Sequence, residues 1–225
     1  MTTLFDPAVI TAKRITHQAI SPLAVLVRPL EKPGRFEGEI VMSGEPISLI
    51  MLDVSEQEAE QPSTIELELG KVADARDGVR LKANRGDFIV VRNTRGGGSY
   101  ALRSTSSEKG ERSPLDTERL LKGDHFAVTL LRPGLWADGK DGVRIRVVHP
   151  RRNELSARDA LSRKAPRLAL DGKTGGEIEV MPGMGVVFDV EFDGASLDLA
   201  LTEPDDGPDR DKGDLRRAGR TYRRR

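Results

Sequence analysis

The chain has 225 residues, of which 37% are hydrophobic and only 4% aromatic, so any core must rest mainly on Val, Ile, Leu and Ala. Lys and Arg number 36 and Asp and Glu number 36, so no global field attracts nucleic acid, which is not an expected partner. The absence of cysteine excludes disulfides, thiolate nucleophiles and cysteine-ligated metal centres. We see no secretory signal and no apolar window long enough to span a membrane, and therefore expect a cytoplasmic protein.

The first 22 residues are expected to form an N-terminal arm. Residues 8–20 have a mixed pattern that fits either a short helix or an extended segment laid against a neighbour. Clean alternation of apolar residues begins at Leu23 and marks the first strand. The acidic residues 55–63 are expected to form a loop.

Alternation with a period of two residues, broken by Gly turns, recurs along the chain and is typical of antiparallel β structure. In the segment 64–69, Ile65 and Leu67 are expected to point inward and Glu66 and Glu68 outward. One convincing helix is predicted at 153–164. The expected strands are 23–27, 36–42, 47–54, 64–69, 79–83, 88–91, 100–102, 126–131, 143–148, 168–170, 178–180, 186–192 and 197–201.

These elements predict an all-β protein: a Greek-key β-sandwich, as one large or two small sandwiches, with one short helix and a charged tail that is disordered when free. Residues 104–117 are rich in Ser, Glu and Lys and are expected to form an internal boundary or a flexible excursion. The predicted organisation is an arm at 1–22, a sandwich at 23–149, a helix with additional strands at 150–202, which could form a second module with 115–149, and a tail at 203–225.

Two strand–turn–strand segments are similar to each other. Aligning Leu81 with Ile178 also places Gly86 on Gly183. Two related β modules would explain this match. The general likeness of strand–turn–strand units explains it as well, and is the interpretation that we favour from the sequence.

Two motifs carry a resemblance to a known family. The residues Gly86-Asp87-Phe88-Ile89-Val90-Val91-Arg92-Asn93 form a Gly-Asp turn that feeds an apolar strand ending at Asn, and Pro133-Gly134-Leu135-Trp136 opens a hairpin before the strand at 143–148. Over residues 64–149 the chain resembles cupredoxin-like domains, which implies a Greek-key β-sandwich. A type 1 copper site needs a thiolate and two imidazoles, and this chain has no thiolate. The resemblance is therefore to a sandwich that lacks the copper site, and we expect no metal and no other cofactor.

No constellation of catalytic residues stands out, and we expect that the protein is not an enzyme. His17, His125 and His149 lie on separate segments without metal-ligand spacing. Glu66 and Glu68 are expected on one solvated strand face, where solvent would level their pKa values.

Two basic regions remain as candidate binding sites. The first is the tail, whose expected partner-binding residues are Arg216, Arg217, Arg220, Tyr222, Arg223, Arg224 and Arg225. The second is the Arg151–Arg167 region, whose candidate anion-binding residues are Arg151, Arg152, Arg158 and Arg163.

The sequence favours a non-catalytic structural or accessory subunit that docks within a larger protein assembly. Peripheral docking on a membrane complex stays open. The alternative is an anion-binding or nucleotide-binding β module that uses the Arg151–Arg167 region.

Overall fold

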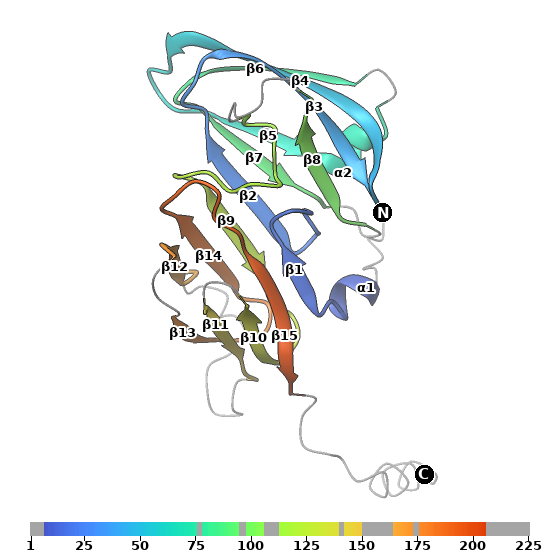
Figure 1. The fold of residues 1–225 in the computed structure, drawn as a ribbon, viewed down its shortest axis with the longest axis vertical. Helices are drawn as coiled ribbons and strands as arrows, with labels where there is room; N and C mark the ends of the chain where they lie inside the picture. The colour runs from blue at the N-terminus through green and yellow to red at the C-terminus, as the bar shows by residue number, and fades with distance from the viewer. Residues whose placement is uncertain are drawn as a thin grey trace, which may run out of the picture.

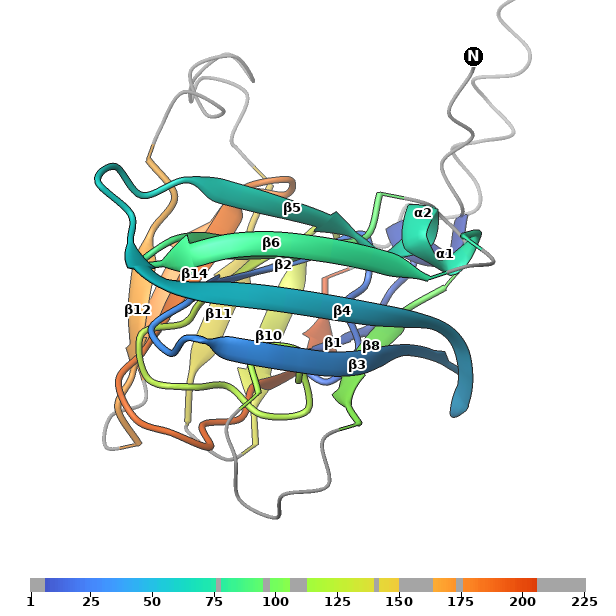
Figure 2. The same cartoon turned by 90° about the horizontal axis from the view of Figure 1, so that it is seen from above.

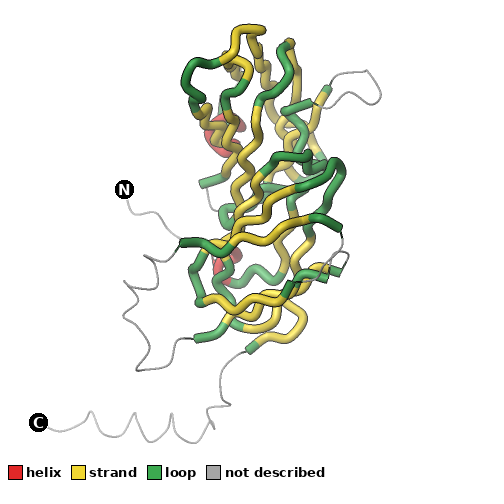
Figure 3. Tube along the Cα trace, turned by 90° about the vertical axis from the view of Figure 1, so that its left-hand side faces the viewer, coloured by secondary structure: helices red, strands yellow, loops and turns green. Residues whose placement is uncertain are grey.

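The computed structural model describes residues 7–75, 78–94, 98–105, 113–139, 142–149, 164–172 and 176–205. Within these residues the fold is all-β, as predicted, because strands supply nearly all of the regular structure (Figure 3). The described helices, α1 (Pro7–Ile10) and α2 (Leu69–Ala73), have only four and five residues, and neither is long and apolar enough to cross a membrane. The helix predicted at 153–164 lies outside the described residues, except for its last residue, Lys164.

After a short strand β1 (Arg14–Thr16), the strands of the described chain fall into two successive units. The first unit consists of β2 (Ala24–Pro29), β3 (Gly34–Met42), β4 (Glu45–Glu58), β5 (Thr64–Glu68), β6 (Val79–Arg85), β7 (Phe88–Arg92) and β8 (Tyr100–Ser104). The second unit consists of β9 (His125–Thr129), β10 (Gly134–Asp138), β11 (Arg144–Val147), β12 (Arg167–Leu170), β13 (Glu177–Val180), β14 (Gly185–Val190) and β15 (Asp198–Pro204).

The two units have the same strand pairings. The first strand of each unit pairs antiparallel with the sixth, the second pairs antiparallel with the third and the seventh, and the third and fifth are parallel, as are the fourth and sixth. Each unit therefore contributes half of a six-stranded central sheet, β12-β14-β9-β2-β7-β5, and has an outer sheet of its own. The first outer sheet is β6-β4-β3-β8, and the second is β1-β15-β10-β11-β13.

The central sheet joins the units through the antiparallel pair β2 and β9, which lie side by side where the upper unit meets the lower one in Figure 1. Val27 pairs with Val90 in the first unit, and Ala127 pairs with Val187 in the second. Gly34 begins the pairing of β3 with β4, and Gly134 begins that of β10 with β11. Residues 23–36 therefore correspond to residues 123–136 without an insertion.

The alignment of Leu81 with Ile178 agrees with the strand register. Leu81 pairs with Leu52, which pairs with Phe36, and Ile178 pairs with Ile145, which pairs with Trp136. The two segments that look alike in sequence thus occupy corresponding places in the two units.

Three glycine turns hold the ends of central strands. Gly86, Gly123 and Gly183 have φ of 92°, 90° and 85°, a region that side-chain-bearing residues rarely adopt. Their N–H groups donate to the carbonyl oxygens of Leu30, Val190 and Leu130, respectively. The Gly turns that were read from the sequence as strand connections therefore also cap neighbouring strands.

The N-terminal residues differ from the helical alternative. Helix α1 ends at Ile10, and β1 then pairs with β15, so the segment after residue 10 is extended. Ile15 and Ile20 are buried in the core: Ile15 pairs with Leu199 of β15, and Ile20 forms a bridge with Tyr100 of β8, so that backbone pairing with both outer sheets replaces a helix here. The part of the arm that spans residues 14–20 thus packs within the same chain.

Two expected loops are also partly ordered into the fold. Strand β4 continues to Glu58, so residues 55–58 are strand and not loop. Of the expected excursion at 104–117, the described residues include Leu115 and Thr117, both fully buried. Thr117 Oγ1 accepts a hydrogen bond from the N–H of Leu102 in β8.

Candidate functional site

A buried ion pair lies at the junction of the two units. Arg28 on β2 and Asp124, just before β9, are 1% and 0% exposed. Arg28 Nε donates to Asp124 Oδ1 at 2.9 Å, and Nη2 donates to Asp124 Oδ2 at 2.7 Å. The fork of the guanidinium thus matches the two carboxylate oxygens, which is the geometry that makes Arg–carboxylate pairs strong.

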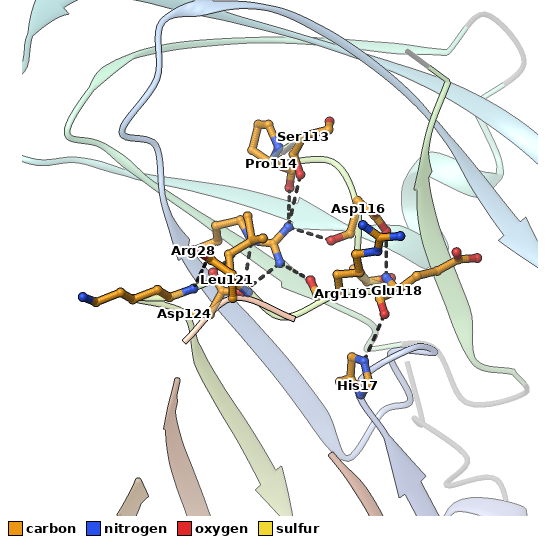
Figure 4. A network of polar contacts seen from close by, with 12 residues as sticks. His17, Arg28, Ser113, Pro114, Asp116, Glu118, Arg119, Leu121 and Asp124 are labelled. Carbon is orange, nitrogen blue, oxygen red and sulfur yellow. Dashed lines mark hydrogen bonds and ion pairs between the residues drawn. The ribbon is translucent and has the colours of Figure 1, made fainter. Parts of the chain in front are cut away.

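The remaining donors of Arg28 bind the segment that links the units. Nη1 donates to the carbonyl oxygens of Asp116 at 2.6 Å and Pro114 at 3.2 Å, and Nη2 donates to that of Arg119 at 2.8 Å (Figure 4). A guanidinium has five N–H donors, and all five are used here. Arg28 therefore orders the linker and has no donor left for a ligand.

His17 fixes the N-terminal residues to the same linker. Its Nδ1 accepts a hydrogen bond from the N–H of Leu197 at 3.1 Å, and its Nε2 donates to the carbonyl oxygen of Glu118 at 3.1 Å (Figure 4). The side chain is buried with both ring nitrogens bonded, so its role is to join β1, the linker and the start of β15.

A cleft of about 630 Å³ opens beside the ion pair, and we call it the seam cleft. Its apolar lining comes from Pro29, Leu30, Phe36, Pro114, Leu121 and Val190. Its charged lining, besides the ion pair, comes from Glu31, Lys32, Lys122, Glu191 and Asp193. Among these exposed residues, Asp193 accepts a hydrogen bond from the backbone N–H of Lys122, which anchors the turn that forms one wall.

The rim of the seam cleft carries charges of both signs. Within the part of the chain that the structure describes, the side chains of Glu31, Lys32, Lys122 and Glu191 form no ion pair. Two cations and two anions are therefore available beside the apolar residues of the cleft.

The repeat relates the cleft to the other side of the junction, where two corresponding residues are larger. Gly123 and Phe36, which line the cleft, correspond to Leu23 and Trp136, which are 9% and 1% exposed. The ion pair itself corresponds to an apolar pair, because Arg28 and Asp124 correspond to Val128 and Ala24, which face each other in the pairing of β2 with β9. The junction is therefore asymmetric in size and in charge, although the strand pairings are the same.

A second charged cluster lies on the central sheet. Asp189 on β14 binds His125 Nδ1 at 2.7 Å and Arg167 Nε at 2.8 Å. Arg167, with a smaller contribution from His125, holds the pKa of Asp189 below its usual range, although partial burial opposes this shift. At the corresponding edge of the first unit the charges are reversed, with Arg92 bound to Glu66.

One carboxylate of the first unit does not lie where the sequence indicated. Glu68 was expected on a solvated face but is 6% exposed. The chain turns into α2 directly after Glu68, and the N–H of Thr94 donates to Glu68 Oε1 at 2.8 Å. The strand alternation correctly predicts that Glu66 is exposed, but the segment after β7 covers Glu68.

Most of the site residues predicted from the sequence lie outside the described residues. These are Arg151, Arg152, Arg158 and Arg163 of the Arg151–Arg167 region, and all of the named residues of the tail. Arg167 is described, and its guanidinium is bound to Asp189. In the described ranges, no three or more His, Asp or Glu side chains come together as a group that could hold a metal ion.

Sequence reasoning did not identify the ion pair or the seam cleft. The available signal was a charged residue on an otherwise apolar strand, Val25-Leu26-Val27-Arg28, because an arginine there is costly to bury without a partner. The identity of that partner depends on the pairing of β2 with β9, which are about 100 residues apart in the chain.

Comparison with known protein families, with characterised proteins and with solved structures finds no match for this chain.

Proposed function

We propose that the protein is a non-catalytic accessory subunit that docks on another protein within a larger assembly. The observation that carries this proposal is a group of exposed apolar residues where the hairpin of β3 and β4 closes. The group consists of Met42, Ile47 and Leu49, which are 37%, 38% and 63% exposed, and we call it the hairpin patch.

The hairpin patch belongs to an enlarged part of the first unit. Strands β3 and β4 have nine and fourteen residues, whereas the corresponding β10 and β11 have five and four. Strand β4 lies between β3 and β6 and is the long central strand of this sheet in Figure 2. The added strand length is not needed for the sandwich, since the second unit forms the same pairings without it.

The neighbours of Leu49 fit a protein partner. Leu49 faces Glu39 in the pairing of β3 with β4, and Glu39 lies 3.7 Å from Arg103. An exposed apolar residue beside paired charges is a usual element of a protein–protein contact. Three exposed apolar residues at the end of one strand pair indicate such a contact more than residues scattered over the surface do.

The other expectations from the sequence stand beside this proposal. We propose that the arginines of the tail, Arg216 to Arg225 with Tyr222, add a second contact with the partner, and that the protein is cytoplasmic. The cupredoxin-like relation remains a prediction. Anion binding by the Arg151–Arg167 region gains no support from Arg167, which is bound to Asp189.

The test is the native size of the assembly. The tagged full chain should elute from an extract of its source cells in a discrete complex larger than the purified protein. Leu49→Asp should shift it toward the size of the purified protein, because a buried carboxylate would have no partner in the interface. Ile10→Asp is the matched control, since Ile10 is 50% exposed and lies in α1.

Both variants need melting temperatures close to that of the unmodified chain for the comparison to hold. Elution of the unmodified chain at its purified size, or equal elution of all three chains, would overturn the proposal.

A further inference from the structure

We infer that the seam cleft binds one bulky apolar side chain of a peptide segment that has a cationic and an anionic residue beside it. This inference rests on the proposed function, because the segment belongs to a protein partner. It concerns a site at the junction of the units, whereas the hairpin patch lies on the first outer sheet.

The size and lining of the cleft suit such a side chain. A volume of about 630 Å³ lies in the range of roughly 300–1,000 Å³ that is typical of ligand sites. Half of the lining residues are uncharged, with Phe36 as the aromatic one, and burial of a large apolar group against them removes it from water.

The repeat-related side of the junction indicates which group fits. There, Leu23 of the first unit corresponds to Gly123 and Trp136 of the second unit corresponds to Phe36, and both larger residues are buried. The same strand framework thus accommodates a leucine and an indole on one side of the junction and leaves an open cleft on the other. A leucine or tryptophan side chain from outside would supply the volume that is missing on the side of the cleft.

The rim specifies what lies beside that side chain. Lys32 and Lys122 can bind carboxylates, and Glu31 and Glu191 can bind ammonium or guanidinium groups. A segment with charges of one sign only would bring like charges together at two of these four residues. A segment with one residue of each sign satisfies both pairs.

The walls of the cleft are held before any partner arrives. Arg28 binds the linker through the carbonyl oxygens of Pro114 and Asp116, and Gly123 N–H binds the carbonyl oxygen of Val190 at 2.9 Å. A preformed cleft loses little conformational entropy on binding, so a short segment can bind without the rest of its protein.

The experiment uses the full chain and two capped tripeptides, acetyl-Glu-Trp-Lys-amide and acetyl-Glu-Ala-Lys-amide. Binding is followed by the amide chemical shifts of ¹⁵N-labelled protein. We expect the Trp peptide to shift the amides of Leu121, Gly123 and Val190, and the Ala peptide to bind at least about tenfold more weakly.

Two variants locate the binding. Phe36→Trp places in the first unit the residue that the second unit has at this position, and should abolish binding by filling the cleft. Lys122→Glu leaves the apolar lining intact and should weaken binding several-fold through the rim. Leu49→Asp should bind the Trp peptide like the unmodified chain, because the hairpin patch is a separate surface.

Four results would overturn the inference. The first is that the Trp peptide at millimolar concentration shifts no amide, and the second is that the two peptides bind equally well. The third is that both Phe36→Trp and Lys122→Glu bind the Trp peptide like the unmodified chain. The fourth is that free indole binds as tightly as the Trp peptide, which would point to a small apolar ligand. If Leu49→Asp still disrupts the native assembly while no peptide binds, the proposed function stands and only this inference fails. If the Trp peptide binds and no native assembly exists, the seam cleft is a peptide site and the proposed function fails.

Discussion

Replacing Arg28 by valine should destabilise the protein strongly. The substitution gives the first unit the residue that the second unit has at Val128, and it leaves the carboxylate of Asp124, which is 0% exposed, without a cation. Removing one partner of a buried ion pair costs about 3–5 kcal/mol. The carbonyl oxygens of the linker also lose their donors, but they are only partly buried and water can reach them.

The double variant Arg28→Val/Asp124→Ala separates charge from packing. It reproduces the corresponding pair across the same strand contact, which is formed by Val128 on β9 and Ala24 on β2. Because no unpaired charge remains, its free energy of unfolding should be about 2 kcal/mol higher than that of Arg28→Val alone. The backbone N–H of Leu121 loses its acceptor on Asp124, so stability should not return fully.

The assay is urea unfolding followed by the fluorescence of Trp136, the only tryptophan, which is 1% exposed. The free energies are compared at equal m-values. A loss of less than about 1 kcal/mol in Arg28→Val would refute the reasoning, as would a double variant less stable than the single one.

Three further predictions concern carboxylates and the tail. The backbone N–H groups of Asn84 and Ser63 hold the pKa of Asp87 below its usual range. The ionised carboxylate therefore stabilises the fold above the unfolded pKa of about 3.9, and this stabilisation is lost as the pH falls through the folded pKa. Asp87→Asn should be less stable than the unmodified chain by about 1–3 kcal/mol at pH 7, and the difference between their urea midpoints should narrow as the pH is lowered. Burial raises the pKa of Asp116, so the ionised carboxylate destabilises the fold at neutral pH, and the protein gains stability as the pH falls through the folded pKa. Asp116→Asn should therefore raise the melting temperature at pH 7 but not below the usual pKa of Asp. A lower melting temperature of this variant at pH 7 would contradict the prediction. Deleting residues 206–225, beyond β15, should leave the melting temperature nearly unchanged and weaken retention in the native assembly, most of all at low salt, where contacts of the arginines are least screened. Unchanged retention across a salt series would count against the tail as a docking element.

The all-β fold could be read from the sequence because the signal is local. Segments such as 64–68 and 178–180 alternate with a period of two, and the Gly turns mark where they end. The predicted strand ends are less accurate, since β4 continues to Glu58 through acidic residues whose composition indicates a loop. An acidic composition predicts only that a segment is in contact with solvent, and this holds for an exposed strand as well as for a loop.

The candidate site could not be read in the same way because it depends on contacts between distant segments. Arg28 and Asp124 meet only when β2 pairs with β9, and Glu68 becomes buried only when the residues after β7 fold over it. The polar residues around Leu115 predict a flexible segment, yet Leu115 is fully buried. In each case a tertiary contact outweighs the local composition.

The docking of the hairpin patch on a protein partner is the central claim, and a site-specific cross-link tests it most directly. A photoreactive phenylalanine analogue is placed at position 49 of the full chain in its source cells, and at position 10 as the control, since both residues are exposed apolar ones. After irradiation, we predict one discrete adduct of higher mass from position 49 and none from position 10. No adduct from position 49, or the same adducts from both positions, would contradict the claim.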